Sequence, residues 1–143
     1  IKIITWDSAK RLPRIEMDRD QIAQVVTNLV DNAVKYSFRG ENIDIRGNKL
    51  QDAVRFSVQD RGIGIPADKR DGIFKPFARL PVRDPTREIA GTGIGLTLVK
   101  NIVEAHGGSI DVSSEPFLDD PRRQSPEDGH VVTFTVTLPR RRK

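Results

Sequence analysis

The feature that most constrains the fold is the stretch Gln24–Tyr36, which has two chemically different sides. Arranged as a helix, at about 100° per residue, one side is apolar and consists of Ile22, Val25, Val26, Leu29, Val30, Ala33 and Val34. The other side carries Gln24, Asn28, Asp31, Asn32 and Lys35. Two Asn one turn apart are costly inside a helix, because the side-chain amide competes with the backbone for hydrogen bonds. The apolar side predicts a helix packed on a core, and the polar side indicates that the two Asn side chains have a task.

Composition bounds the class of protein. The chain has 143 residues, of which 36% are hydrophobic and 31% charged, as expected for one soluble domain with a core. The absence of Cys excludes disulfides and thiolate metal sites, and two His do not support a His-rich metal cage. The sequence shows neither an apolar run of the ~20 residues that span a membrane nor a signal peptide. The net charge of +4 comes partly from a basic tail at 140–143, and aromatic residues do not alternate with the basic ones, so nucleic-acid binding has little support.

Apolar periodicity and turn residues predict the order of strands and helices. We expect strands at Ile1–Trp6, Asn42–Asn48, Ala53–Gln59, Ser109–Ser114 and Val131–Leu138, the second and third forming a hairpin. We expect helices from Arg19, capped by Asp18, to Ser37, from Pro66 to about Phe74, and from the Gly91–Gly95 stretch to Gly107. One face of the last helix should carry Ile94, Leu98, Ile102 and Ala105, with Val99 and Val103 beside them. This order excludes a repeated βαβ unit and predicts an α/β (α+β) sandwich, with helices on one face of a mixed, mostly antiparallel sheet.

Two glycine clusters are candidates for contact with a ligand. Glycine lets the backbone approach a ligand closely and a helix N-terminus favours anions, so Gly91-Thr92-Gly93-Ile94-Gly95 fits a phosphate-binding loop. The same glycines are equally well explained as turn formers. The chain has no P-loop motif, and no strand precedes Gly91, which excludes the Rossmann fingerprint. In Asp60-x-Gly62-x-Gly64, the carboxylate either caps a tight turn or accepts a hydrogen bond from an exocyclic amine such as that of adenine, and the glycines would leave a slot for a flat ring.

The Asn pair has the chemistry of a magnesium site. Amide oxygens are suitable hard ligands for Mg²⁺, which retains several waters and bridges to phosphates. Asn28 and Asn32 lie one turn apart on one side of the predicted helix, and Lys35, on the next turn, can reach a phosphate oxygen. The alternative is a polar side that packs on a neighbouring loop.

Together and in this order, the motifs resemble a known family. Four stretches are similar to the N, G1, F and G2 boxes of the catalytic, ATP-binding domain of sensor histidine kinases, namely Asn28–Tyr36, Asp60–Ile65, Ile73–Phe77 and Gly91–Leu96. Val99–Gly108 resembles the family's stretch after the G2 box, and Phe134–Pro139 resembles its closing strand. The resemblance covers nearly the whole chain. It implies the Bergerat (GHKL) fold, a mixed sheet covered on one face by three helices, with ATP held between the helices and a flexible lid.

The resemblance assigns roles to residues of the first three boxes. Asn32 would be the main Mg²⁺ ligand, with Asn28 assisting directly or through water, and Lys35 would contact phosphate as part of the catalytic set. Tyr36 would line the ribose and adenine side. Asp60 would bind the adenine amino group, in a pocket shaped by Gly62, Gly64 and Ile65.

The irregular segment Lys75–Ala90 would be the lid, which explains its lack of period. Phe74 and Phe77 would anchor its root, and Arg79 would contact phosphate during catalysis. Closure over the triphosphate would involve Gly91, Thr92, Gly93, Gly95 and Leu96. The implied organisation is a catalytic domain over residues 1–139, with the lid at about 75–93, a flexible loop at 116–128 and a basic tail at 140–143. By the same resemblance, His106 and His130 are structural residues.

One position indicates the reaction. Gyrase-type ATPases and some kinases of this superfamily place a Glu, which prepares a nucleophile, one turn before the metal-binding Asn, and this chain has Asn28 there. The resemblance therefore implies slow hydrolysis and transfer of the γ-phosphoryl group of ATP to a His on a separate dimerisation and phosphoacceptor domain.

That phosphoacceptor domain is expected upstream of Ile1 in a larger parent kinase, with a response regulator downstream. The present domain is expected to be cytoplasmic and, in isolation, monomeric, whether or not the parent spans a membrane. Two alternatives remain open: a Ser/Thr kinase or ATPase of the same superfamily, such as an anti-sigma factor, and a nucleotide-sensing module without catalysis.

Overall fold

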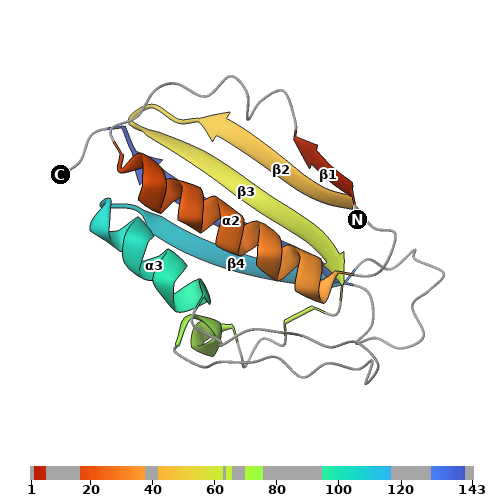
Figure 1. The fold of residues 1–143 in the computed structure, drawn as a ribbon. Coiled ribbons are helices and arrows are strands. Elements are labelled where there is room, and N and C mark those ends of the chain that lie inside the picture. The colour runs from red at the N-terminus through yellow and green to blue at the C-terminus, as the bar shows by residue number, and fades with distance from the viewer. Residues whose placement is uncertain are drawn as a thin grey trace.

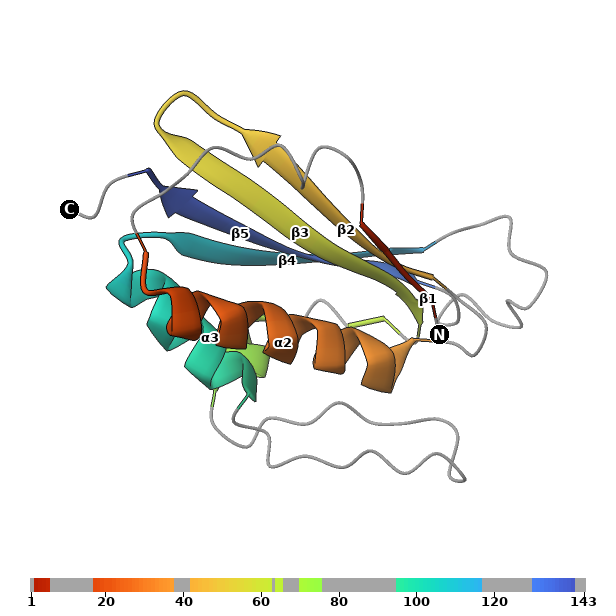
Figure 2. The ribbon, with the colours of Figure 1, turned by 45° about the horizontal axis from the view of Figure 1, so that its top comes forward.

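A computed structural model of the chain describes residues 2–5, 17–37, 42–62, 64–65, 70–75, 95–116 and 130–140. In these residues five strands form one sheet in the order β1-β2-β3-β5-β4, and two α-helices cover one of its faces (Figure 1 and Figure 2). The strands are β1 (Lys2–Thr5), β2 (Asn42–Lys49), β3 (Ala53–Gly62), β4 (Ser109–Pro116) and β5 (His130–Pro139). Only the β1–β2 pair is parallel among these strands, so the sheet is mixed and mostly antiparallel, as predicted.

The first helix, α2 (Arg19–Tyr36), has the predicted bounds within one residue. Its N-cap is Asp18, whose side chain accepts a hydrogen bond of 3.1 Å from the backbone N–H of Gln21. The buried stripe is narrower than predicted and consists of Ile22, Val25, Leu29 and Ala33. Val34 is 37% exposed, because it lies at the margin of the apolar side.

The second helix, α3 (Gly95–Ala105), packs beside α2 on the same face of the sheet (Figure 2). It ends in a Schellman motif, in which Gly107 has a φ of 75° and the N–H of Gly108 donates to the carbonyl of Val103 at 3.0 Å. The predicted apolar line through Leu98 and Ala105 is wrong, since both are exposed. The buried positions are Val99, Ile102, Val103 and His106, the i, i+3, i+4, i+7 stripe of a helix.

The strand β3 is longer than predicted and includes Asp60 and Gly62. Its additional residues pair with β5, since Asp60 lies opposite Val132 and Gly62 lies opposite His130. The acidic and glycine residues at this end have low strand propensity, and a long-range partner strand overrides it.

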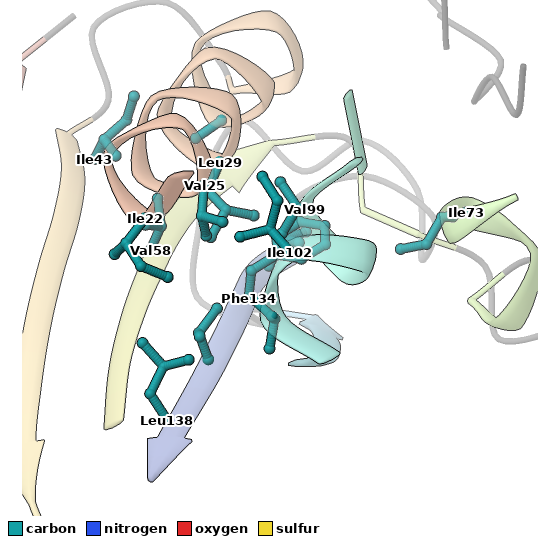
Figure 3. Packing of buried hydrophobic residues seen from close by; sticks show 14 of the residues in the cluster. Ile22, Val25, Leu29, Ile43, Val58, Ile73, Val99, Ile102, Phe134 and Leu138 are labelled. Carbon is teal, nitrogen blue, oxygen red and sulfur yellow. The ribbon is translucent and has the colours of Figure 1, made fainter. Parts of the chain in front are cut away.

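The core lies between the sheet and the two α-helices. Val25 and Leu29 of α2, Val99 and Ile102 of α3, and Phe134 of β5 point into the same space (Figure 3). Along β5 the buried residues alternate, so that Val132, Phe134, Val136 and Leu138 face the helices.

Of the helix predicted from Pro66 to about Phe74, the described residues contain a single-turn 3-10 helix, Asp71–Phe74. The predicted lid, apart from Lys75, lies outside the described residues, as does the 116–128 loop apart from Pro116. No helix of the described residues is both long and apolar enough to cross a membrane.

Candidate functional site

The polar side of α2 meets the beginning of α3. Asn28 is half-buried, and its Nδ2 donates a hydrogen bond of 3.4 Å to the carbonyl oxygen of Gly95, the first residue of α3. This contact uses the amide nitrogen and does not involve Oδ1, the atom that would bind a cation. Asn32 and Lys35, on the following turns of α2, are half-buried as well. Because a helix N-terminus has unpaired N–H groups and the positive end of the helix dipole, a negative group is favoured beside this polar side.

Asp60 lies near the end of β3, on the face that the helices cover. Its neighbours on that face, Val54, Val58 and Gly62, are buried, and Asp60 itself is 3% exposed. The end of α2 reaches this point, because Ser37 forms a β-bridge with Gly62. The tight-turn alternative is wrong, since Asp60 is paired within a strand. A buried carboxylate needs hydrogen-bond donors to offset its lost hydration, so the position suits an acceptor for a donor group of a ligand or of the protein.

Glycines of the predicted site are required for different reasons. A Cβ on Gly62 would overlap the backbone carbonyl of Tyr36, and Gly64 has a φ of 79° with the ring of His130 against it. The space beside Gly62 and Gly64 is therefore filled by the protein itself. The flat slot predicted between these glycines is not open at either position. Among the described residues, a Cβ on Gly95 would meet nothing within 4 Å, so packing against them does not explain this glycine.

Phe74, which was predicted to anchor the root of the lid, is fixed to the core. Its ring packs edge-to-face on Phe134, with centroids 6.3 Å apart. The ammonium of Lys100 lies 5.8 Å from the centroid of the Phe74 ring, and Thr97 Oγ1 donates a 2.7 Å hydrogen bond to the Phe74 carbonyl oxygen. Three contacts from α3 and β5 thus hold this residue.

Of the other residues predicted for the nucleotide site, some lie within the described residues and some outside them. Tyr36, the last residue of α2, and Leu96, in the first turn of α3, are half-buried, while Ile65 is buried in the core. Five predicted site residues lie outside the described residues, and their roles stay predictions: Phe77, Arg79, Gly91, Thr92 and Gly93.

Sequence reasoning missed a polar network next to Gly64. The backbone N–H of Ile65 donates to Ser114 Oγ at 3.0 Å, and Ser114 Oγ lies 3.2 Å from His130 Nδ1. Arg70 donates through Nε to the Ile65 carbonyl at 3.3 Å and through Nη2 to the Ser114 carbonyl at 2.8 Å. The network joins three segments that are far apart in the sequence.

The alternation of β4 contains a signal that identifies Ser114. Ile110 and Val112 are partly buried against the core, and Ser114 is the next residue on their side of the strand. A Ser at a position where strand period expects an apolar side chain is a candidate for a buried polar contact. Ser114 is 4% exposed, in agreement with that position.

His106 is a structural residue, as predicted. Its ring is 2% exposed, and Nε2 accepts a 3.0 Å hydrogen bond from the backbone N–H of Asp18. Nδ1 lies 2.8 Å from the carbonyl oxygen of Ile102, which can only accept, so the hydrogen resides on Nδ1. His106 thereby joins the C-terminus of α3 to the N-cap of α2, at the end of the helix pair away from Gly95.

A polar hollow of about 210 Å³ at the ends of β2 and β3 is a poor candidate for the nucleotide. Its lining is Asn42, Asp44, Gln59, Asp60 and Arg61. Asp44 and Gln59 lie opposite each other in the β2–β3 pair, out of phase with the buried Ile43 and Val58. Asp44 and Gln59 therefore line the hollow from the face of the sheet away from α2 and α3, whereas Asp60 belongs to the covered face.

The polar side chains of α2 fit a cation that is held mainly by substrate phosphates and water, with few ligands from the protein. In the part of the chain that the structure describes, no three His, Cys, Asp or Glu side chains are grouped to hold a metal ion. Mg²⁺ accepts such a site, because it is commonly bound by one or two protein oxygens together with substrate phosphates and water. Asn28 and Asn32 can supply those protein oxygens, and Lys35 adds a positive charge for phosphate.

Comparison with known proteins decides the family. The model of the histidine kinase-, DNA gyrase B- and HSP90-like ATPases matches residues 17–142. The chain belongs to this ATPase family. The predicted resemblance is thereby confirmed, and the nucleotide-binding character of the family agrees with the position of the polar side of α2.

Similar proteins within the family include a sensor protein, a sensory kinase and a sensor histidine kinase. The alginate biosynthesis sensor protein KinB of Pseudomonas aeruginosa is 40% identical over 105 residues, which are 73% of this chain and 17% of KinB. The adaptive-response sensory kinase SasA of a Nostoc species is 44% identical over 114 residues, 79% of this chain and 28% of SasA. The structure of the mycobacterial sensor histidine kinase MprB has a TM-score of 0.73 and 26% identity, and the match covers 99% of this chain and 83% of that one.

These comparisons confirm the predicted Bergerat-type fold. The chain spans less than a third of the length of KinB and of SasA.

Proposed function

We propose that this member of the ATPase family binds Mg²⁺–ATP between α2 and the start of α3 and transfers the γ-phosphoryl group to a His of a separate phosphoacceptor domain. The observation that carries the proposal is the hydrogen bond from Asn28 to Gly95, which brings the amide side chains of α2 to the N-terminus of α3. The buried Asp60 lies on the same face of the sheet. The names of the relatives, which are sensor kinases, support the choice of reaction.

In this proposal each polar residue has one partner on the nucleotide. Asn32 is the main Mg²⁺ ligand and Asn28 assists, while Lys35 contacts a phosphate oxygen. Tyr36 lines the ribose and adenine side, and Asp60 accepts a hydrogen bond from the adenine amino group, beside Gly62, Gly64 and Ile65. The residues proposed to close over the triphosphate or to belong to the lid are Phe77, Arg79, Gly91, Thr92, Gly93, Gly95 and Leu96.

The residue at position 28 favours phosphoryl transfer over hydrolysis. A Glu there would act as a base for water, whereas the Asn28 amide cannot accept a proton at neutral pH. Phosphoryl transfer depends mainly on alignment and on neutralising charge, which Lys35, the α3 N-terminus and the bound Mg²⁺ provide. An imidazole nitrogen of the acceptor His attacks the γ-phosphorus, the bond to the β–γ bridging oxygen breaks, and ADP leaves.

The proposal extends to the protein's setting. Kinases of this type act in two-component signalling, so we place the domain on the cytoplasmic side of its parent protein, upstream of a response regulator. The isolated chain is proposed to be a monomer that phosphorylates nothing until the phosphoacceptor domain is supplied.

Labelling with γ-³²P-ATP in the presence of the parent's phosphoacceptor domain tests the reaction. We expect acid-labile, base-stable phosphate on that domain, no transfer with Asn32→Ala, and normal transfer with the control Asn48→Ala, an exposed Asn on β2. Acid-stable phosphate would indicate a Ser/Thr kinase, and release of inorganic phosphate without an acceptor would indicate an ATPase. ATP binding without either product would indicate a nucleotide-sensing module.

A further inference from the structure

The segment that leaves β3 is held by side chains and not by a strand partner. Gly64 and Ile65 follow the last strand residue, Gly62, and both are buried. The Ile65 N–H donates to Ser114 Oγ at 3.0 Å, and its carbonyl accepts from Arg70 Nε at 3.3 Å. Buried backbone groups need such partners, so these two side chains determine where the segment can lie.

Ser114 is the centre of this network. Its Oγ accepts from Ile65, its carbonyl accepts from Arg70 Nη2 at 2.8 Å, and its Oγ also contacts His130 Nδ1 at 3.2 Å. When the hydrogen of His130 is on Nε2, Ser114 donates its hydroxyl hydrogen to Nδ1, so that the hydroxyl acts as donor and acceptor at once. Arg70 contacts the two carbonyls through two nitrogens of its rigid planar guanidinium, a geometry that the single ammonium nitrogen of a Lys does not reproduce.

The side chain of His130 packs against Gly64. His130 lies opposite Gly62 in the β3–β5 pair, and a Cβ on Gly64 would come within 2.5–2.8 Å of three atoms of its side chain. Gly64 is therefore confined between its own φ of 79° and the imidazole. Gly64 and Ile65, which lie outside the sheet, therefore have little conformational freedom.

We propose that Ser114 is a positioning residue for the nucleotide. By fixing the Ile65 peptide, it holds Gly62 and Gly64 in a constant position relative to Asp60, which precedes Gly62 by two residues in β3. The adenine edge then meets a backbone surface that is already in place before the nucleotide binds. The inference rests on the proposed function, since it assumes that the base lies at Asp60. Arg70 supports the same peptide from its carbonyl side.

A positioning role differs from a purely structural one in what it changes. Loss of a structural hydrogen bond lowers the stability of the fold but leaves the folded protein with the same selectivity. Loss of the Ile65 acceptor leaves a buried N–H without a partner, which the segment relieves by moving. Adenine recognition then weakens, while contacts to phosphate, at the other end of the nucleotide, are retained.

The test compares Ser114→Ala with Ser113→Ala in the 143-residue chain. Ser113 precedes Ser114 and is exposed on the opposite face of β4, which makes it a matched control. Titration calorimetry with Mg²⁺–ATP and with Mg²⁺–GTP gives the two affinities, and urea unfolding gives stability. For Ser114→Ala we expect an ATP Kd raised about tenfold, the factor that corresponds to 1.4 kcal/mol, with the GTP Kd changed less, so that the ATP-to-GTP preference falls. Ser113→Ala should match the wild type.

Arg70→Lys provides an independent variant in case Ser114→Ala does not fold. It retains the charge and should lower the ATP preference in the same direction, because a single ammonium nitrogen does not reproduce the geometry of the two carbonyl contacts. In both variants the amide of Ile65 should exchange with deuterium faster than in the wild type. If these variants fold and keep the wild-type ratio of ATP to GTP affinity, the positioning role is refuted and nucleotide binding stands. If the wild type itself binds no ATP, the proposed function fails.

Discussion

Replacement of His106 by Ala should destabilise the protein without weakening nucleotide binding. The variant loses the 3.0 Å bond from the Asp18 N–H and the 2.8 Å bond to the Ile102 carbonyl. At about 0.5–1.5 kcal/mol for each bond, plus the cavity left by a ring that is 2% exposed, we expect a loss of about 2–4 kcal/mol. For a domain of this size that corresponds to a Tm lower by about 6–15 °C.

The location of His106 predicts that function is retained. It follows the last residue of α3, about 16 Å along the helix from Gly95 at 1.5 Å per residue, and the nucleotide is proposed to lie at the Gly95 end. Urea unfolding measures the stability, and calorimetry at 10 °C measures the ATP Kd, which should stay within about twofold of the wild type. Glu104→Ala is the control, because Glu104 is exposed and its side chain forms a 3.9 Å surface pair with Lys100, worth about 0.5 kcal/mol or less. A loss below about 1 kcal/mol in His106→Ala, or abolished ATP binding in a folded variant, would contradict this account of the helix junction.

Two glycines and the buried carboxylate allow further predictions. Gly62→Ala should cost more than about 2 kcal/mol in urea unfolding, because its Cβ would overlap the Tyr36 carbonyl; wild-type stability would refute the packing argument. Gly95→Ala should leave stability equal or slightly higher, since its Cβ would contact none of the described residues, yet raise the ATP Kd in calorimetry; unchanged affinity would show that no ligand approaches Gly95. Asp60→Ala should remove the preference for ATP over GTP, and an unchanged ratio of Kd values would exclude adenine recognition by Asp60.

The first helix could be predicted closely from the sequence because all its signals are local. Asp18 supplies a cap, and Ile22, Val25 and Leu29 recur at helical spacing. The strands of the hairpin were predictable for the same reason, as alternation and a short polar turn are visible within 20 residues. The end of β3 was not, because Asp60 and Gly62 pair with β5, about 70 residues later in the chain.

The candidate site divides in the same way. Asn28, Asn32 and Asp60 were recognisable because their chemistry is unusual for their local pattern. The contact between Asn28 and Gly95 follows from the packing of α2 on α3, so the sequence indicated both residues without indicating that they touch. Arg70 and Ser114 have no local pattern that joins them, and their shared contact with Ile65 exists only in the folded chain.

The most direct test of the central claim is a calorimetric titration of the chain with ATP, in the presence of Mg²⁺ and in EDTA, for the wild type and for Asn32→Ala. If α2 presents a magnesium and phosphate site to the start of α3, the wild type binds one ATP with Mg²⁺ and at least tenfold more weakly in EDTA. Asn32→Ala then binds equally weakly under both conditions, because the main proposed metal ligand is gone. Wild-type binding that does not depend on Mg²⁺, or an Asn32→Ala variant with full Mg²⁺-dependent affinity, would contradict the assignment of this helix face as the metal site.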